Sequence, residues 1–507
     1  MCRDLFQTEL RSLDTASVSE DIIESHRVSM KVLKGPKEAL SAKILAIRQA
    51  QKSIDITVYQ LFKDETGYLY LHELQKAAAR GVRVRLLVDA LGSFSFSHHE
   101  LEHLLNTFTG VRPEVKLANL TFHPKPAFAR FMSLLRGETS FRNWFSSLNS
   151  RVHDKIVLID SGTPEAFAIF GSANMTNDST GLGSSEKDTT KEIEAIVRPI
   201  RGAGTIDADQ EIENYFESLY EFIGNHQLWD RSPNIFDFSG ARMQQNYVSA
   251  SANADKVMDL EKNIQQMAQE NFLNTQLTPS DFELVHELPN LIRKTNVFTM
   301  KWFRWGKRLN EKTVVRSLSK RMLRAQKRIE IVSPYFLIGD TDIRKIERLL
   351  LKKPDLEFHL YINSFTTIDH RTASAIFEEF VGPKLAALKT NPLIGERLKI
   401  KVFVGDSKAD LLPNYFHMKA VRVDDEFWIG SHNFDFRSIR LNSEVGAWMN
   451  SPQGHLEIGK AIAEIDRYSV EWGSPAWLNI IQQNPVFFDF QKFILSVSKV
   501  FKIQLLL

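Results

Sequence analysis

The segment HDKIVLID at residues 153–160 has a second copy, HMKAVRVD, at residues 417–424. Both copies carry the pattern His-x-Lys-x4-Asp on apolar, β-branched stretches that predict a strand. After a short turn, each is followed by another apolar run ending in Gly-Ser-x-Asn, at 171–174 and 430–433. A bare His-x-Lys-x4-Asp would occur by chance in about one chain in twenty of this size, but two copies of the longer pattern exclude coincidence. Each motif is therefore expected to form one β-hairpin.

The repetition extends upstream of the two hairpins. Residues 50–56 read AQKSIDI and residues 325–331 read AQKRIEI, and each opens a β-type run. In both halves a helical stretch and a second apolar run follow before the His-x-Lys-x4-Asp segment. Strands that alternate with helices at this spacing predict an α/β unit with a largely parallel sheet. Two such units are expected in tandem.

A chain of 507 residues is too long for a single hydrophobic core, so a boundary between two domains is expected. The segment 231–310 has no evident counterpart in the other half and is richer in Asn, Gln and Ser. The expected division is an N-terminal extension at 1–30, a first lobe at 31–230, a linker or insertion at 231–310, a second lobe at 311–472 and a C-terminal amphipathic segment at 473–507.

Composition limits the classes of protein that fit. Hydrophobic residues make up 43% and charged residues 25%, as in ordinary soluble domains, and a net charge of +2 gives no global attraction to nucleic acid. The only cysteine is Cys2, which excludes a disulfide framework and a cysteine-based metal cluster. No apolar run has the length of a signal peptide or a membrane-spanning helix. The prediction is a cytoplasmic protein that is soluble or peripheral on the membrane.

The motif residues suit phosphodiester chemistry. Because side chains alternate along a strand, His153 and Lys155 point the same way, as do His417 and Lys419. Two such hairpins together offer two imidazoles, two ammonium groups and two asparagine amides, which can hold a phosphate without a metal or cofactor. One histidine can attack phosphorus and the other can protonate the leaving oxygen. The residues expected to bind or support the phosphate are Ser172, Asn174, Ser431 and Asn433.

The acidic residues divide into two groups. Asp160 and Asp424 complete the two motifs, but they lie an odd number of residues from the histidines and are expected to face away and form turns. A carboxylate that orients each imidazole must come from elsewhere. Glu192 and Glu444 each begin an apolar strand after a Gly-Ser-x-Asn and are the candidates, with Glu194 as the rival of Glu192. The alternative for each is a solvated glutamate at a strand end.

With both motifs quoted, the chain resembles the phospholipase D superfamily and, more narrowly, the short soluble type of bacterial cardiolipin synthase. The resemblance rests on HDKIVLID, GSAN, HMKAVRVD and GSHNFDFRS, the last followed by LNSEVG. It implies two tandem α/β/α lobes with a pseudo-two-fold active site between them, and a phosphatidyl group passed through phosphohistidine to a lipid alcohol. It also implies that His153 is the nucleophile and His417 the acid and base, a choice that the residues themselves leave open. The polar stretch 177–191 departs from the family pattern.

The prediction of the substrate class depends on two less specific features of the sequence. Cations interleave with aromatic residues at 293–308, and residues 486–507 form an apolar helical face opposite a cationic one, both typical of membrane interfaces. The alternatives are a partly buried helix with a basic face, and a helix docked on the protein or another subunit. We expect a peripheral membrane enzyme that acts on phospholipid. A hydrolase releasing phosphatidic acid, a nuclease-like phosphodiesterase and an inactive lipid-binding scaffold are the alternative hypotheses.

Overall fold

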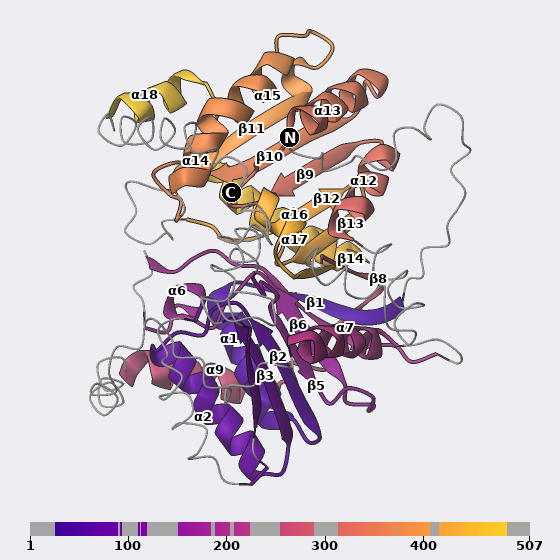
Figure 1. Ribbon diagram of the computed structural model, residues 1–507, viewed down its shortest axis with the longest axis vertical. Helices are drawn as coiled ribbons and strands as arrows, with labels where there is room; N and C mark the ends of the chain where they lie inside the picture. The colour runs from indigo at the N-terminus through magenta and orange to yellow at the C-terminus, as the bar shows by residue number, and fades with distance from the viewer. Residues whose placement is uncertain are drawn as a thin grey trace, which may run out of the picture.

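The computed structural model describes residues 26–89, 92–93, 110–111, 113–118, 151–183, 188–202, 207–223, 254–287, 313–369, 371–405 and 415–483. Within these ranges, fifteen strands form one continuous sheet. Figure 1 shows the first half of the chain, in indigo and magenta, below the second half, in orange and yellow. The molecule therefore consists of two lobes that share a sheet.

The first lobe contains seven of these strands. They are β1 (His26–Leu33), β2 (Ser53–Val58), β3 (Arg83–Asp89), β4 (Glu114–Ala118), β5 (Ile156–Ile159), β6 (Phe167–Gly171) and β7 (Glu194–Pro199). Its helices are α1 (Pro36–Gln49), α2 (Glu65–Ala79), α6 (Asn177–Thr180) and α7 (Ala208–Ile223). Every residue of β2, β5 and β6 is buried, as expected for strands covered by helices on both faces.

The second lobe repeats this plan. Its strands are β8 (Thr278–Glu287), β9 (Arg328–Val332), β10 (Glu357–Asn363), β11 (Leu398–Phe403), β12 (Ala420–Val423), β13 (Glu426–Gly430), β14 (Glu444–Asn450) and β15 (Ser469–Glu471). Its helices are α12 (Val314–Arg324), α13 (Asp340–Lys352), α14 (Arg371–Ile376), α15 (Gly382–Leu388), α16 (Phe436–Arg440), α17 (Pro452–Arg467) and α18 (Pro475–Gln483), with a π-helix at Phe377–Val381.

The strand order reveals the pseudo-two-fold relation. From the centre outward, the first lobe runs β1-β7-β6-β5-β2-β3-β4 and the second runs β8-β14-β13-β12-β9-β10-β11. The three outer strands of each set are parallel, whereas the hairpin strands and their neighbours are antiparallel, so each half-sheet is mixed rather than largely parallel. The hairpins require this, because their two strands run in opposite directions. Tandem α/β/α lobes are confirmed.

The two lobes join at the antiparallel pair β1 and β8, where His26 lies opposite Phe282. One buried apolar cluster includes side chains of both lobes, among them Phe170 and Tyr215 from the first and Phe427 and Ile458 from the second. Helices α7 and α17 supply much of this shared cluster, and separate clusters lie under α1 and α2 and under α12 and α13. The region between the two motif hairpins therefore rests on a common core.

The segment 231–310, expected to be a linker or insertion, contributes structure to both lobes. Helix α9 (Ala254–Gln269) packs on α1, where Glu261 binds Arg48 at 2.6 Å. Strand β8 occupies in the second lobe the position that β1 occupies in the first. We therefore propose that the second lobe begins at β8 rather than at residue 311.

Two segments that the sequence analysis assigned to the membrane, 293–308 and 486–507, lie outside the described residues. Part of the C-terminal segment is described: α18 places Trp477 against Phe365, with ring centroids 5.2 Å apart. Of the helices in the described ranges, none is both long and apolar enough to cross a membrane.

Candidate active site

The two histidines lie where the lobes meet. His153 precedes β5 and His417 precedes β12, and the residue before each histidine forms a β-bridge with the opposite lobe: Val152 with Ser443, and Phe416 with Lys191. The backbone N–H of His153 donates to Ser443 O at 3.1 Å, and that of His417 donates to Lys191 O at 2.8 Å. These bridges fix both imidazoles at the junction between the lobes.

Glu444 is hydrogen-bonded to His153. The Nδ1 atom of His153 lies 2.9 Å from Glu444 Oε2, and both side chains are buried. Since an ionised carboxylate can only accept, Nδ1 carries the proton and Nε2 is left as the basic nitrogen. Glu444 is itself held by Ser431 Oγ at 2.6 Å and Ser438 Oγ at 2.7 Å. The imidazole is thus fixed in one tautomer and one orientation.

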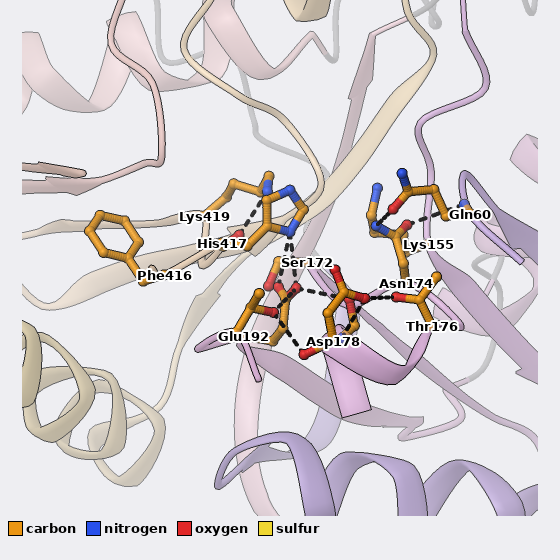
Figure 2. A network of polar contacts seen from close by, with 12 residues as sticks. Gln60, Lys155, Ser172, Asn174, Thr176, Asp178, Glu192, Phe416, His417 and Lys419 are labelled. Atoms are coloured by element: carbon orange, nitrogen blue, oxygen red, sulfur yellow. Dashed lines mark hydrogen bonds and ion pairs between the residues drawn. The ribbon is translucent and has the colours of Figure 1, made fainter. Parts of the chain in front are cut away.

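Glu192 has the same relation to His417 (Figure 2). Its Oε1 and Oε2 atoms lie 3.0 and 3.3 Å from His417 Nδ1, and Thr190 Oγ1 donates to Oε1 at 3.0 Å. Glu194, the rival in the sequence, pairs instead with Lys43 at 2.5 Å, and both of these side chains are buried. Each histidine is therefore bound by a glutamate of the other lobe, a crossing that no local pattern in the sequence indicates.

The motif lysines repeat one contact in both lobes. Lys155 Nζ donates to His153 O at 2.7 Å, and Lys419 Nζ donates to His417 O at 2.7 Å. Burial lowers the pKa of Lys155 to about 8 and that of Lys419 to about 7. A bound phosphate would favour the charged form of both, so these ammonium groups are suited to holding an anion.

The charges around the imidazoles are unequal. Burial, followed by the nearby cations Lys155 and Lys419, holds the pKa of His153 well below its usual value. Burial by itself would raise the pKa of the Glu192 carboxyl, but His417 and Lys419 lower it to about 2. The site therefore combines a histidine that favours its neutral form with a glutamate that remains ionised.

The serine and the asparagine of each Gly-Ser-x-Asn segment make different contacts. Ser172 and Ser431 are fully buried; Ser431 supports Glu444, and Ser172 Oγ exchanges hydrogen bonds with the backbone of Ile193, next to Glu192. These serines support the glutamates. Asn174 Nδ2 donates to Gln60 Oε1 at 2.9 Å, as Figure 2 shows. Asn433 Oδ1 is buried and has no hydrogen-bond partner among the described residues.

The motif aspartates form the hairpin turns. Asp160 and Asp424 both have left-handed backbones, with φ of 48° and 50°. The Asp160 carboxylate accepts the backbone N–H groups of residues 51–53 at 2.7 to 2.9 Å as its shortest contacts. The Asp424 carboxylate accepts those of residues 326–328 at 2.7 to 3.0 Å. The repeated AQK segment is therefore the part of each lobe to which the hairpin is tied.

Sequence reasoning missed a second pair of polar residues. Asp89 Oδ2 accepts the backbone N–H of Val152 at 3.0 Å, and Asn363 Oδ1 accepts that of Phe416 at 3.1 Å. Asp89 ends β3 and Asn363 ends β10, so a polar residue closing the same apolar run in both halves was the available signal. Each holds the residue before a histidine in place.

A family model described as cardiolipin synthase, phospholipase D-like domain, matches residues 44–220 and 318–468, which is more than half of the chain. The chain belongs to this family of phospholipase D-like enzymes. The family and the two-lobed fold agree with the resemblance drawn from the motifs.

Individual relatives refine the comparison. Cardiolipin synthase C of Escherichia coli (strain K12) is 24% identical over 444 residues, covering 86% of this chain and 84% of that protein. A cardiolipin synthase of Geobacillus thermodenitrificans (strain NG80-2) is 30% identical over 145 residues, 28% of this chain and 24% of that protein. The crystal structure of phosphatidylserine synthase from Haemophilus influenzae Rd KW20 aligns over 94% of this chain and 95% of that one, with a TM-score of 0.58 and 15% identity. The last similarity concerns the fold alone.

Proposed function

We propose that this protein transfers a phosphatidyl group between glycerophospholipids through a phosphohistidine, as a cardiolipin-synthase-like enzyme. One observation carries the proposal: two imidazoles, each bound at Nδ1 by a buried glutamate of the opposite lobe, lie beside two buried lysines. The family and the name of the Escherichia coli relative support a phosphatidyl donor.

In the first step, we assign the attack to His153. Its Nε2 lone pair forms a bond to phosphorus while the bond from phosphorus to the headgroup alcohol breaks. His417, protonated at Nε2, gives its proton to the departing oxygen. Lys155 and Lys419 stabilise the charge that develops on the phosphoryl oxygens. The low pKa of His153 supports its role as the nucleophile, because attack requires the unprotonated nitrogen.

In the second step, the lipid alcohol gives its hydroxyl proton to Nε2 of His417. The alcohol oxygen bonds to phosphorus, and the bond between phosphorus and His153 Nε2 breaks. Glu444 and Glu192 hold the two imidazoles in place throughout. Water in place of the alcohol would release phosphatidic acid, which is the hydrolase alternative.

Product analysis tests this proposal. The purified protein is incubated with phosphatidylglycerol vesicles, with and without phosphatidylethanolamine or a free alcohol, and the lipids are identified by mass spectrometry. A new diphosphatidyl product is expected. Phosphatidic acid alone would establish the hydrolase, and cleavage of DNA without lipid turnover would contradict a lipid substrate.

Both histidines should be essential. His153→Ala and His417→Ala are each expected to lower turnover by at least about a thousandfold, because removal of either one interrupts the covalent route. His72→Ala, on the exposed side of α2, is the matched control and should leave turnover unchanged. Near-native turnover in either active-site variant would contradict a shared site.

A further inference from the structure

The two half-sites differ at two positions that the pseudo-symmetry makes equivalent. Arg437 lies seven residues after Gly430, and Asp178 lies seven residues after Gly171. Arg151 lies two residues before His153, whereas Tyr415 occupies the corresponding position before His417. The two histidine–glutamate pairs are duplicated. At these two positions, however, the half-site of His153 has arginines, whereas the half-site of His417 has a tyrosine and an aspartate.

The arginines lie around His153. Tyr59 lies beside Arg437 and Arg151, and its ring centroid is 4.8 Å from that of His153. Lys155 Nζ lies 5.6 Å from the centre of the same tyrosine ring. Arg437 is also near enough to act electrostatically on His153. The half-site of His153 therefore has two arginines beyond its motif lysine, and Asp89 acts on one of them, Arg151.

The guanidinium group of Arg437 has a hydrogen-bond donor without a partner among the described residues. Its Nε is buried and has no hydrogen-bond partner in the part of the chain that the structure describes. Its counterpart Asp178 is fully engaged: it contacts Thr176 Oγ1, the N–H of Ser179 at 2.9 Å and Tyr415 OH at 3.4 Å. A partly buried guanidinium with a free donor, beside a nucleophile for phosphorus, is suited to an anionic oxygen.

We propose that Arg437 is a further substrate-binding residue, which donates to a non-bridging oxygen of the phosphoryl group while that group is transferred to and from His153. Arg151 lies on the same side, where the nearby Asp89 offsets its charge. The half-site of His417, with Tyr415 and Asp178, lacks this cation and receives the alcohol. The asymmetry thus orients the donor lipid with phosphorus toward His153. This inference rests on the proposed function. It identifies Arg437 as the residue that distinguishes the half-site of His153 from that of His417.

Steady-state kinetics with the full chain test the contact. Arg437→Gln is expected to lower kcat/KM for the phosphatidyl donor about 10- to 100-fold with water or any alcohol as acceptor, because a charge-assisted hydrogen bond is lost. Arg437→Lys should retain more activity, and added guanidinium ion should partly restore Arg437→Gln. Arg344→Gln, an exposed arginine of α13, is the matched control and should show neither loss nor rescue.

Two results would overturn the inference. One is wild-type kcat/KM in Arg437→Gln; the other is a loss accompanied by a lower melting temperature and no response to guanidinium, which would indicate a structural role. The orientation is tested by trapping wild-type enzyme during turnover with an alkaline denaturing quench and locating the phosphoryl adduct by peptide mass spectrometry. Adduct at His153 supports it and adduct at His417 overturns it. Absence of phosphatidyl transfer by the wild type would instead contradict the proposed function.

Discussion

His153 depends on a carboxylate that lies 291 positions further along the chain, and His417 on one 225 positions earlier. At the scale of single residues, the site therefore consists of two crossed imidazole–glutamate pairs. In each pair the glutamate has its own set of hydroxyl donors, which hold the carboxylate in place.

The crossed pairs lead to a prediction about Glu444 and Glu192. Substitution of either by Gln should lower kcat/KM at least about tenfold with little change in donor KM, because an amide cannot stabilise the imidazolium as a carboxylate does. In Glu444→Gln, Ser431 and Ser438 also compete for a single remaining acceptor. The exposed Glu396→Gln is the control. Unchanged kinetics in both active-site variants would show that the glutamates are dispensable.

The buried lysines predict a dependence of binding on pH. Burial lowers the pKa of Lys419 to about 7 and of Lys155 to about 8, so both lose their protons in the free enzyme as pH rises through this range. Donor KM should therefore rise between about pH 7 and pH 9. In Lys419→Arg, whose guanidinium stays charged, the rise should be smaller. KM values measured across this range that do not change would contradict charged-lysine binding.

At the scale of elements, each hairpin is tied to the start of its lobe by an aspartate. Asp160 is buried and accepts three backbone N–H groups, whereas the amides that Asp424 accepts are exposed. Both aspartates adopt a left-handed backbone, which Asp and Asn tolerate better than Ala.

This difference in burial gives a prediction for the turns. Asp160→Ala should lower the free energy of unfolding by about 2–4 kcal/mol, and Asp424→Ala by about half as much, because water can replace the lost acceptor only at the exposed turn. Urea denaturation of the two variants measures the difference, with Asp160→Asn as a milder substitution at the same turn. Equal losses for the two alanine variants would contradict the role of burial.

At the scale of the whole molecule, the two lobes share one sheet and one apolar cluster. Strands β1 and β8 pair across the junction, and a single apolar cluster draws on both lobes. The crossed glutamates add polar contacts between the lobes at the active site. Neither half-site is complete without the other lobe.

This continuity predicts cooperative unfolding. Scanning calorimetry of the full chain should show one transition with equal calorimetric and van't Hoff enthalpies, because separation of the lobes would expose the shared core. Two resolved transitions would contradict a common core. Glu444→Gln should shift the transition without splitting it, since the shared apolar cluster remains.

The sequence by itself determined the residues of the two motifs, the duplication and the family. These signals are local: the period of two along a strand puts His153 and Lys155 on one face, and spacing alone reveals the repeat. The same alternation of side chains indicated that Asp160 faces away from His153 and Lys155, although the sequence did not identify the backbone amides that Asp160 binds.

Only the tertiary structure decided which glutamate meets which histidine, how β8 completes the second lobe, and where Arg437 lies relative to His153. Glu444 and His153 are brought together by the pairing of two lobes about a pseudo-two-fold axis. No local periodicity contains that information, because the contact depends on how the lobes associate rather than on either segment alone. The same holds for Arg437: motif spacing makes it equivalent to Asp178, but its place near Tyr59 and His153 becomes visible only in the structure.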